Sequence, residues 1–399
     1  MIPVGTNLRL KRIPLTTVSL ILVNWVIFIF LRWDYYKTYF WAQQYLFSVP
    51  GEQYPWQLVT SMFLHDGFWH ILGNSYFLYV FGIFVEDKIG WKAYLFLYFF
   101  TGIGANLVHG IMVGLFMRDS LFIPSLGASG AVSGIMGVYL YRCYYSKIKL
   151  IISLWIPIRI QIPAVVVLGL WFLKDLVGGI DSIRGMYQNV AFWAHIGGFA
   201  FGLAACKYLK YGIEARKEKT QFIADTKTDR AVGYGEGIAA CEKLLEEEPK
   251  NPGLHLKLAR AKSRRRASEA GRRHYETAIK LLLRADAKQA AEIFAEYWAQ
   301  YLRVMEPRFQ VLLSRLIYKH VDPDLSAKTL QTLIEGNEPS DQAMEEAHLD
   351  LAAIYGRLGR GDLARYVYGL FLKRFPTSRY RQFAEKKLGA ITPMTAVQG

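Results

Sequence analysis

Residues 126–141 read Leu-Gly-Ala-Ser-Gly-Ala-Val-Ser-Gly-Ile-Met-Gly-Val-Tyr-Leu-Tyr, an apolar run with four glycines and no charged residue. As a helix, this run rises about 24 Å and nearly crosses a hydrocarbon core of about 30 Å. Five further stretches are long and apolar enough, or nearly so, to do the same. The six predicted spans are residues 15–33, 68–85, 91–113, 126–141, 160–180 and 190–209. The sequence therefore predicts an all-α, polytopic membrane domain over residues 1–210.

The charged residues divide the 399-residue chain into two parts. Residues 1–210 contain 24 charged side chains, whereas the remaining 189 residues contain 57. This contrast excludes a single soluble domain, and the apolar content excludes a disordered chain. The stretch 211–228 is charged and poorly patterned, which indicates a linker. Residues 229–390 have helical periodicity and predict a soluble, cytoplasmic domain.

Loop charges predict the orientation of the spans in the membrane. Thirteen Lys and Arg residues flank the spans on one side and four lie in the loops of the other side. Because positive loops stay in the cytoplasm, we expect both termini there, in a bacterial inner membrane. The overall charge of +15 is spread over short loops beside apolar runs, so we expect no nucleic-acid partner.

Ser129 is a polar residue near the outer end of the fourth predicted span. Gly127, Gly130 and Gly134 surround it, and helix packing through a GxxxG face is the simplest explanation of these glycines. The G-x-S-x-G motif of soluble hydrolases is not matched, because Ala131 stands in place of its last glycine.

His195 is the polar residue near the outer end of the sixth span, and Gly198 and Gly202 follow it on a small-residue face. A packing role, a metal site and a proton relay are all possible for such a histidine. No second ligand follows it at i+3 or i+4, so we expect no metal. Nucleotide motifs are also absent, so we expect no cofactor.

Ser129 and His195 are predicted to lie at similar depths, about four and six residues below the outer boundary. If their glycine faces pack together, the imidazole can take the hydroxyl proton as the oxygen attacks a carbonyl. Asp175 and Asp181 belong to a different helix or loop, so no carboxylate is well placed as a third member. We therefore expect a dyad.

His70 and Asn74 are four residues apart near the outer end of the second span, so they share one helix face. Such a pair often caps a helix start. It can also donate hydrogen bonds to the oxygen that becomes negative during acyl transfer, together with backbone N–H groups around Ser129.

These motifs, His70-x-x-x-Asn74, Gly127-Ala128-Ser129-Gly130 and Ala194-His195-x-x-Gly198, occur in this order on spans two, four and six. In this arrangement, residues 10–210 resemble the rhomboid intramembrane serine proteases. The resemblance implies that Ser129 is the nucleophile and His195 the general base. It also implies an oxyanion hole formed by His70, Asn74 and the Ser129 amide. The expected substrates are transmembrane proteins, cut near the outer membrane face.

Three positions depart from the family pattern. Gln57 follows Trp56 where the family often has arginine. Ser133 stands where many relatives carry an aromatic residue that supports the histidine ring, and Val190 stands where a glycine often precedes the Ala-His pair. Both catalytic positions are retained, so we expect an active enzyme.

The C-terminal part resembles a tetratricopeptide-like helical repeat near its end. The offsets that carry the resemblance are those of Leu351, Ala352, Tyr355, Gly359, Ala364, Tyr368 and Pro376. A plain helical bundle is the alternative. We expect this domain to bind a protein partner, while the membrane domain contacts lipid. The alternative function is a non-proteolytic membrane scaffold that binds transmembrane segments and recruits partners through the repeats.

Overall fold

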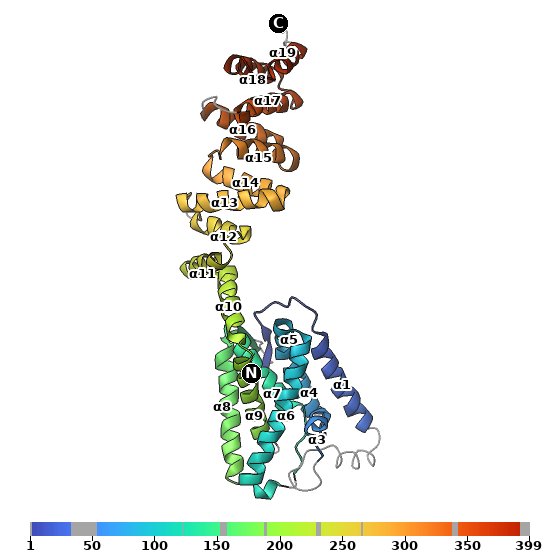
Figure 1. The fold of residues 1–399 in the computed structure, drawn as a ribbon. Coiled ribbons are helices and arrows are strands. Elements are labelled where there is room, and N and C mark those ends of the chain that lie inside the picture. The colour runs from blue at the N-terminus through green and yellow to red at the C-terminus, as the bar shows by residue number, and fades with distance from the viewer. Residues whose placement is uncertain are drawn as a thin grey trace. The chain divides into compact units, whose positions relative to one another are not determined.

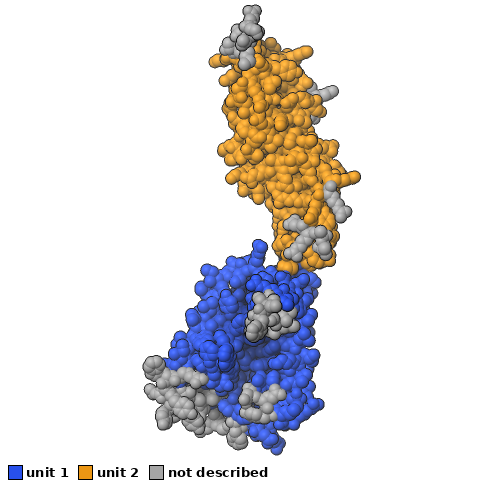
Figure 2. Space-filling view, turned by 180° about the vertical axis from the view of Figure 1, so that it is seen from behind, with its two compact units in different colours: residues 1–219 blue, residues 220–399 orange. Residues whose placement is uncertain are grey.

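The computed structural model describes residues 2–32, 54–121, 123–151, 158–186, 190–228, 233–264, 266–336 and 342–391. It divides into two compact units, residues 1–219 and residues 220–399 (Figure 2). Most of the described residues are helical, as the sequence predicts. The boundary falls within helix α10 (Tyr211–Lys227), so the stretch expected to be a linker forms a helix.

The first unit is a bundle of helices that lie side by side (Figure 1). Its helical elements are α1 (Leu15–Arg32), α3 (Gln57–Thr60), η1 (Ser61–Phe63), α4 (Phe68–Phe77), η2 (Leu78–Gly82), α5 (Ile83–Ile89), α6 (Trp91–Phe116), η3 (Arg118–Ser120), α7 (Ser129–Arg142), α8 (Ala164–Ile183) and α9 (Phe192–Tyr208). Helix occupies each of the six ranges predicted as spans. Among the described residues, Phe68–Ile89 and Trp91–Phe116 are the two helical segments that are long and apolar enough to cross a membrane.

Helix α7 lies at the centre of this bundle and contacts α6, α8 and α9. Its side chains Ile135, Val138 and Tyr139 are fully buried, as are most of their neighbours on the same helix. A helix enclosed on all sides cannot shift without disturbing the packing around it. The residue at its start, Ser129, is therefore placed by the whole bundle.

A small antiparallel sheet, which the sequence did not predict, joins three distant segments of the first unit. Strands β1 (Ile2–Thr6), β2 (Lys147–Ile151) and β3 (Arg159–Pro163) lie in the order β1-β2-β3. As a result, the fifth helix begins at Ala164 rather than at residue 160. Residues 159–163 alternate polar and apolar side chains and end in proline, a pattern that suits a strand better than the first turn of a helix.

Glu86, near the end of α5, ties that helix to the start of α1. Its carboxylate accepts hydrogen bonds from the backbone N–H groups of Thr16 at 2.9 Å and Thr17 at 2.7 Å, and from the Thr17 hydroxyl at 2.7 Å. The first N–H groups of a helix have no carbonyl partner within that helix, so a buried carboxylate there satisfies them.

At the opposite end of α7 from Ser129, a buried arginine holds the start of α10. The Arg142 guanidinium lies 2.9 Å from Glu214 and 3.4 Å from Glu218, and it faces the ring of Tyr211. Lys88 also pairs with Glu218 at 3.3 Å. Arg142 is 1% exposed, so the positive charge that holds α10 has little access to water, whereas its partner Glu214 is largely exposed.

The second unit is a series of helices stacked in chain order (Figure 1). After α10 these are α11 (Tyr234–Glu247), α12 (Pro252–Lys262), α13 (Glu269–Ala285), α14 (Ala287–Tyr301), α15 (Pro307–His320), α16 (Pro323–Gly336), α17 (Gln342–Arg357), α18 (Gly361–Arg374) and α19 (Arg381–Ala390). From α11 onward each helix contacts the next, and three apolar clusters lie between them.

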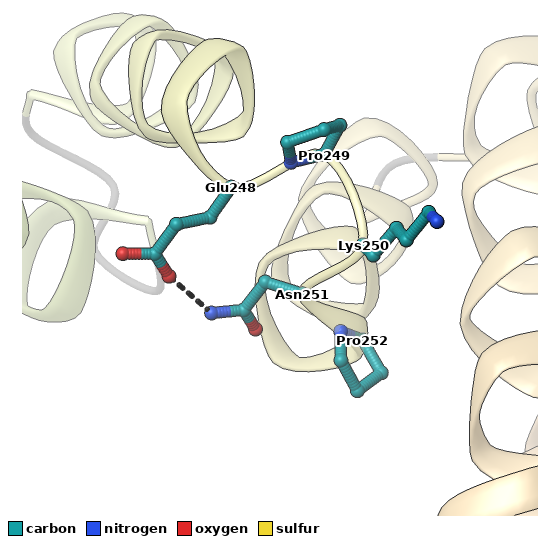
Figure 3. A pocket seen from close by; sticks show the side chains of 5 residues that line it. All are labelled: Glu248, Pro249, Lys250, Asn251 and Pro252. Atoms are coloured by element: carbon teal, nitrogen blue, oxygen red, sulfur yellow. Dashed lines mark hydrogen bonds between the residues drawn. The ribbon is translucent and has the colours of Figure 1, made fainter.

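The turn between α11 and α12 shows how one such connection is made, and it lines a shallow surface pocket (Figure 3). Asn251 caps α12 by accepting hydrogen bonds from the N–H groups of Gly253 and Leu254. Its amide donates to Glu248 at 2.9 Å. Pro252 follows at the first helical position, where its missing N–H costs nothing.

Candidate active site

Ser129 is the first residue of α7, three residues later than the start of the predicted span. The delay comes from Gly127, which has φ +112°, a left-handed conformation that glycine adopts readily. The Gly127 N–H donates to the Ser61 carbonyl at 2.9 Å and holds the turn in place. Because Ser129 opens the helix, its own N–H has no acceptor within α7.

Glycines bring α7 and α9 into backbone contact. A Cβ added at Gly198 would lie 3.0 Å from the Gly130 carbonyl carbon, and one added at Gly202 would lie 3.1 Å from the Gly134 carbonyl carbon. Both separations are shorter than ordinary van der Waals contacts, so only glycine, whose side chain is a single hydrogen, fits at these two positions of α9. The structure thus brings together the four glycines that the sequence predicted to form two facing surfaces.

This contact places the residues around Ser129 and His195 next to each other. A Cβ added at Gly130 would lie 3.7 Å from the Ala194 carbonyl oxygen. The backbone that follows Ser129 therefore lies against the backbone that precedes His195. Between Ser129 and His195 themselves, the described contacts include no hydrogen bond. Resting active sites often have longer separations that shorten when substrate binds.

His195 is held by two residues of α8. Its Nδ1 lies 2.9 Å from the Asp175 carboxylate, and its ring stacks on Trp171 with centroids 5.9 Å apart. Asp175 is 1% exposed, and Lys174 lies 3.2 Å from its other oxygen. The prediction that no carboxylate is well placed beside His195 was therefore wrong. Asp175 does belong to a different helix, but that helix packs against α9.

The sequence does contain a signal for Asp175, the same one that singled out Ser129 and His195: a polar residue within an apolar span. An ionisable residue in an apolar stretch is expensive and marks a functional site by default. Asp175 follows Trp171 by four residues, so both lie on one face of the helix. What the sequence does not give is the rotation of α8, which decides whether this face meets His195.

His70 and Asn74 approach the turn that precedes Ser129. A Cβ at Gly127 would lie 2.6 Å from His70 Nε2 and 3.6 Å from Asn74 Nδ2. Gly127, grouped with the helix-packing glycines in the prediction, therefore makes room for these two side chains. Asn74 Nδ2 is buried and has no hydrogen-bond partner among the described residues. A buried donor left unpaired is costly, and it is available to an oxygen that arrives with the substrate.

Two further residues complete this side of the site. His70 Nδ1 lies 2.6 Å from the Asp66 carboxylate, an arrangement that leaves Nε2 facing Gly127. His65, which the sequence analysis did not single out, accepts a hydrogen bond from the Ala128 N–H at 3.5 Å and packs edge-on against the His70 ring. Burial lowers the pKa of His65 to about 4, so its ring is neutral near pH 7.

Two of the three positions that depart from the family pattern have hydrogen-bond partners of their own. Gln57 is buried and accepts a hydrogen bond from the Tyr54 N–H at 3.2 Å. The Ser133 hydroxyl donates to the Ser129 carbonyl at 2.7 Å. Trp171 supplies an aromatic surface for His195 from α8, although position 133 of α7 is a serine. Val190 is exposed just before α9, and nothing in its surroundings explains the residue.

The comparison with protein families covers the part of the chain that holds these residues. Residues 52–211 match the rhomboid domain family. The matched range covers 160 of the 399 residues, so this part of the chain is similar to a rhomboid domain. A rhomboid domain indicates a multi-pass membrane protein, and the matched range contains all of the site residues described above.

Several curated proteins are similar to part of this chain. A putative rhomboid protease, YdcA of Bacillus subtilis, is 34% identical over 90 residues, which are 23% of this chain and 42% of the relative. The mitochondrial RHOMBOID-like protein 6 of Arabidopsis thaliana is 28% identical over 42% of this chain and 50% of its own length. The mitochondrial rhomboid protein 1 of Saccharomyces cerevisiae is 26% identical over 41% and 44%. This chain thus spans half or less of the length of these curated relatives.

Proposed function

We propose that this protein is an intramembrane serine endopeptidase that cleaves transmembrane segments near the outer membrane face. Ser129 is the nucleophile and His195 the general base. The observation that carries the proposal is the contact between Gly130 and Ala194, which sets the start of α7 against the start of α9. An alcohol and an imidazole held on adjacent backbones are the two groups that acyl transfer needs.

The reaction begins when the Ser129 oxygen attacks the carbonyl carbon of the scissile peptide bond. As the new C–O bond forms, the hydroxyl proton passes to His195, and the electron pair of the carbonyl moves to its oxygen. His195 then returns the proton to the leaving amine, and an acyl-enzyme remains. Water from the outer face repeats the cycle and releases the carboxylate product.

The negative oxygen of the intermediate is stabilised by donors that already point at the turn before Ser129. Asn74 Nδ2 is one of them, because it is buried and unpartnered within the described protein. The Ser129 N–H is a second, since it opens α7. His70 is a third when Nε2 carries a proton, which happens in the doubly protonated ring while Nδ1 donates to Asp66.

The substrate must be a helix that unwinds readily. An intact transmembrane helix holds its carbonyls in hydrogen bonds to the N–H groups four residues on, so a nucleophile cannot reach them. Glycine weakens such a helix, because its helix propensity is poor and it leaves the backbone exposed. We therefore propose substrates with a glycine-containing stretch near the outer end of their transmembrane segment.

The test is cleavage of a model transmembrane substrate by the purified protein in liposomes. Wild type is compared with Ser129→Ala, His195→Ala and the matched control Ser133→Ala, which removes a hydroxyl one turn further along α7. A fluorophosphonate probe should label the wild type and Ser133→Ala only. Cleavage by these two and by neither catalytic variant supports the proposal. Equal cleavage by all four, or none by wild type, refutes it and favours the non-proteolytic scaffold.

The second unit is proposed to be a cytoplasmic, tetratricopeptide-like domain that binds a protein partner. Ala352 of α17 and Ala364 of α18 are both buried where these helices pack, and Gly359 between them has φ +73°. Small residues at the contact and glycine at the turn suit a repeat built from helix pairs. The excess of positive charge in alternate loops supports the proposal that both termini are cytoplasmic, in a bacterial inner membrane.

A further inference from the structure

The ring of His195 contacts two side chains of α8 that lie one turn apart. Asp175 Oδ2 is 2.9 Å from Nδ1, and the Trp171 ring stacks on the imidazole at 5.9 Å with an angle of 27° between the planes. From this geometry we propose that Asp175 and Trp171 are positioning residues for catalysis. Asp175 selects the productive tautomer of His195, and Trp171 fixes the plane of the ring. This inference rests on the proposed function.

The carboxylate determines which nitrogen of His195 is free. An ionised carboxylate accepts hydrogen bonds and donates none, so Nδ1 must carry the proton in the neutral ring. Nε2 then presents a lone pair, which is the acceptor that the Ser129 hydroxyl proton requires. When that proton moves to Nε2, the ring becomes an imidazolium with a carboxylate at hydrogen-bond distance. Asp175 keeps its own charge throughout and touches neither Ser129 nor the substrate.

The position of Asp175 makes this interaction strong. Its side chain is 1% exposed, and in such a place a charge must be paired to be tolerated. Two partners are present, His195 on one oxygen and Lys174 on the other. Lys174 is largely exposed, so water solvates its charge, and that charge does not change during the reaction. The positive charge that forms and disappears near Asp175 is the one on His195.

A structural role, in which Asp175 only fastens α8 to α9, is the competing explanation. The two helices are already joined by other contacts nearer the start of α9. Trp193 Nε1 donates to the Gly179 carbonyl at 3.1 Å, and the Phe192 ring packs on Gly178 so closely that a Cβ there would lie 2.6 Å from it. These contacts join α8 to α9 without Asp175.

Asp175→Asn separates the two explanations, because it keeps the size of the side chain and changes its hydrogen-bonding character. The asparagine amide can donate to Nδ1, which moves the ring proton to Nε2 and blocks that nitrogen as a base. We expect kcat to fall about 100-fold or more while KM stays within about twofold, by analogy with the triad of soluble serine proteases. Trp171→Phe should keep activity within about threefold, and Trp171→Leu should lose about tenfold.

The matched control is Asp181→Asn, the same change on the same helix. Asp181 pairs with Arg184 at 3.7 Å and makes no described contact with His195, so this variant should cleave like wild type. If wild type cleaves and Ser129→Ala does not, while Asp175→Asn keeps its kcat within threefold of wild type, the inference fails and the proposed function stands.

A second measurement does not depend on activity. Nitrogen-15 NMR of the full chain labelled at its histidine rings, with the His195 signals assigned by their loss in His195→Gln, reports the tautomer directly. We expect the proton on Nδ1 in wild type and on Nε2 in Asp175→Asn. The same tautomer in both proteins would overturn the inference, even if no transmembrane substrate were cleaved by wild type.

Discussion

Replacing Gly198 with alanine tests whether the contact between α7 and α9 sets the catalytic geometry. The new Cβ would lie 3.0 Å from the Gly130 carbonyl carbon and would overlap the carbonyl oxygen. Carbon atoms pack at about 3.5–4.0 Å, so α9 must recede by about 0.5–1 Å to relieve the carbon contact alone, and further to clear the oxygen. The obstacle is backbone, so no side-chain rotation can avoid the movement.

His195 moves with the helix that carries it. It lies three residues before Gly198, within one turn, so a displacement of α9 at Gly198 is transmitted to the imidazole almost in full. A misplacement of about 1 Å between reacting groups can cost about 100-fold in rate. Overpacking of this kind also destabilises a fold by about 1–3 kcal/mol. We expect Gly198→Ala to fold and to cleave about 100-fold more slowly than wild type.

The assay is cleavage of a transmembrane substrate in liposomes, with thermal unfolding measured on the same preparation. Gly169→Ala on α8 is the matched control, since a Cβ there would meet nothing within 4 Å. This variant should keep the wild-type rate. If Gly198→Ala remained folded and cleaved within twofold of wild type, the backbone contact between α7 and α9 would not control the distance between the catalytic groups.

Three further predictions concern the rest of the protein. Asn74→Ala should lower kcat about tenfold or more, because it removes a donor to the oxyanion. Thermal stability should stay unchanged, because the lost amide nitrogen is buried and has no described hydrogen-bond partner. Unchanged turnover would exclude Asn74 from the site. Arg142→Met removes the ion pairs with both glutamates of α10, which should cost about 0.5–1.5 kcal/mol each, because the carboxylates are partly exposed. Amide hydrogen exchange in α10 should become faster, and equal protection in the two proteins would contradict this. Burial lowers the pKa of His348 in α17 below its value in the unfolded chain. Near and below pH 6.5 the unfolded chain therefore binds more protons than the folded protein, and the second unit should lose stability as the pH falls from about 7 to 5. Thermal melting of His348→Gln, followed by circular dichroism at both pH values, should show a smaller pH dependence than wild type.

The helices of the membrane domain could be predicted from the sequence because apolar runs of this length have few alternatives. Their starts were less certain, for reasons that are local. Helix α7 begins at Ser129, because Gly127 takes a left-handed conformation that ends the preceding loop. Helix α8 begins at Ala164, because the residues before it pair with β2. Pairing between strands far apart in the chain depends on both segments, so the sequence of either one alone predicts it only weakly.

The candidate site was predicted in part. Ser129 and His195 stand out because polar groups are rare in apolar helices, and their glycine-rich surroundings indicate close packing. Asp175 obeys the same rule, but its use depends on how α8 is rotated about its axis. His65 precedes α4 in a loop, where a histidine carries no such signal. Both residues were missed because a contact between elements depends on the rotation and path of each, and a single sequence does not give these.

A general base inside a helical bundle has three requirements: the right distance, the right tautomer and the right ring plane. Here each is met by a different contact. The glycines of α7 and α9 set the distance, Asp175 sets the tautomer, and Trp171 sets the plane. Ser133 of α7, one turn after Ser129, is too small to reach the His195 ring as an aromatic residue would, and its hydroxyl donates a hydrogen bond to the Ser129 carbonyl. In the proposed mechanism helix α8 therefore contributes to catalysis although it carries no reacting atom. Any motion that separates α8 from α9 would release His195 from both Asp175 and Trp171.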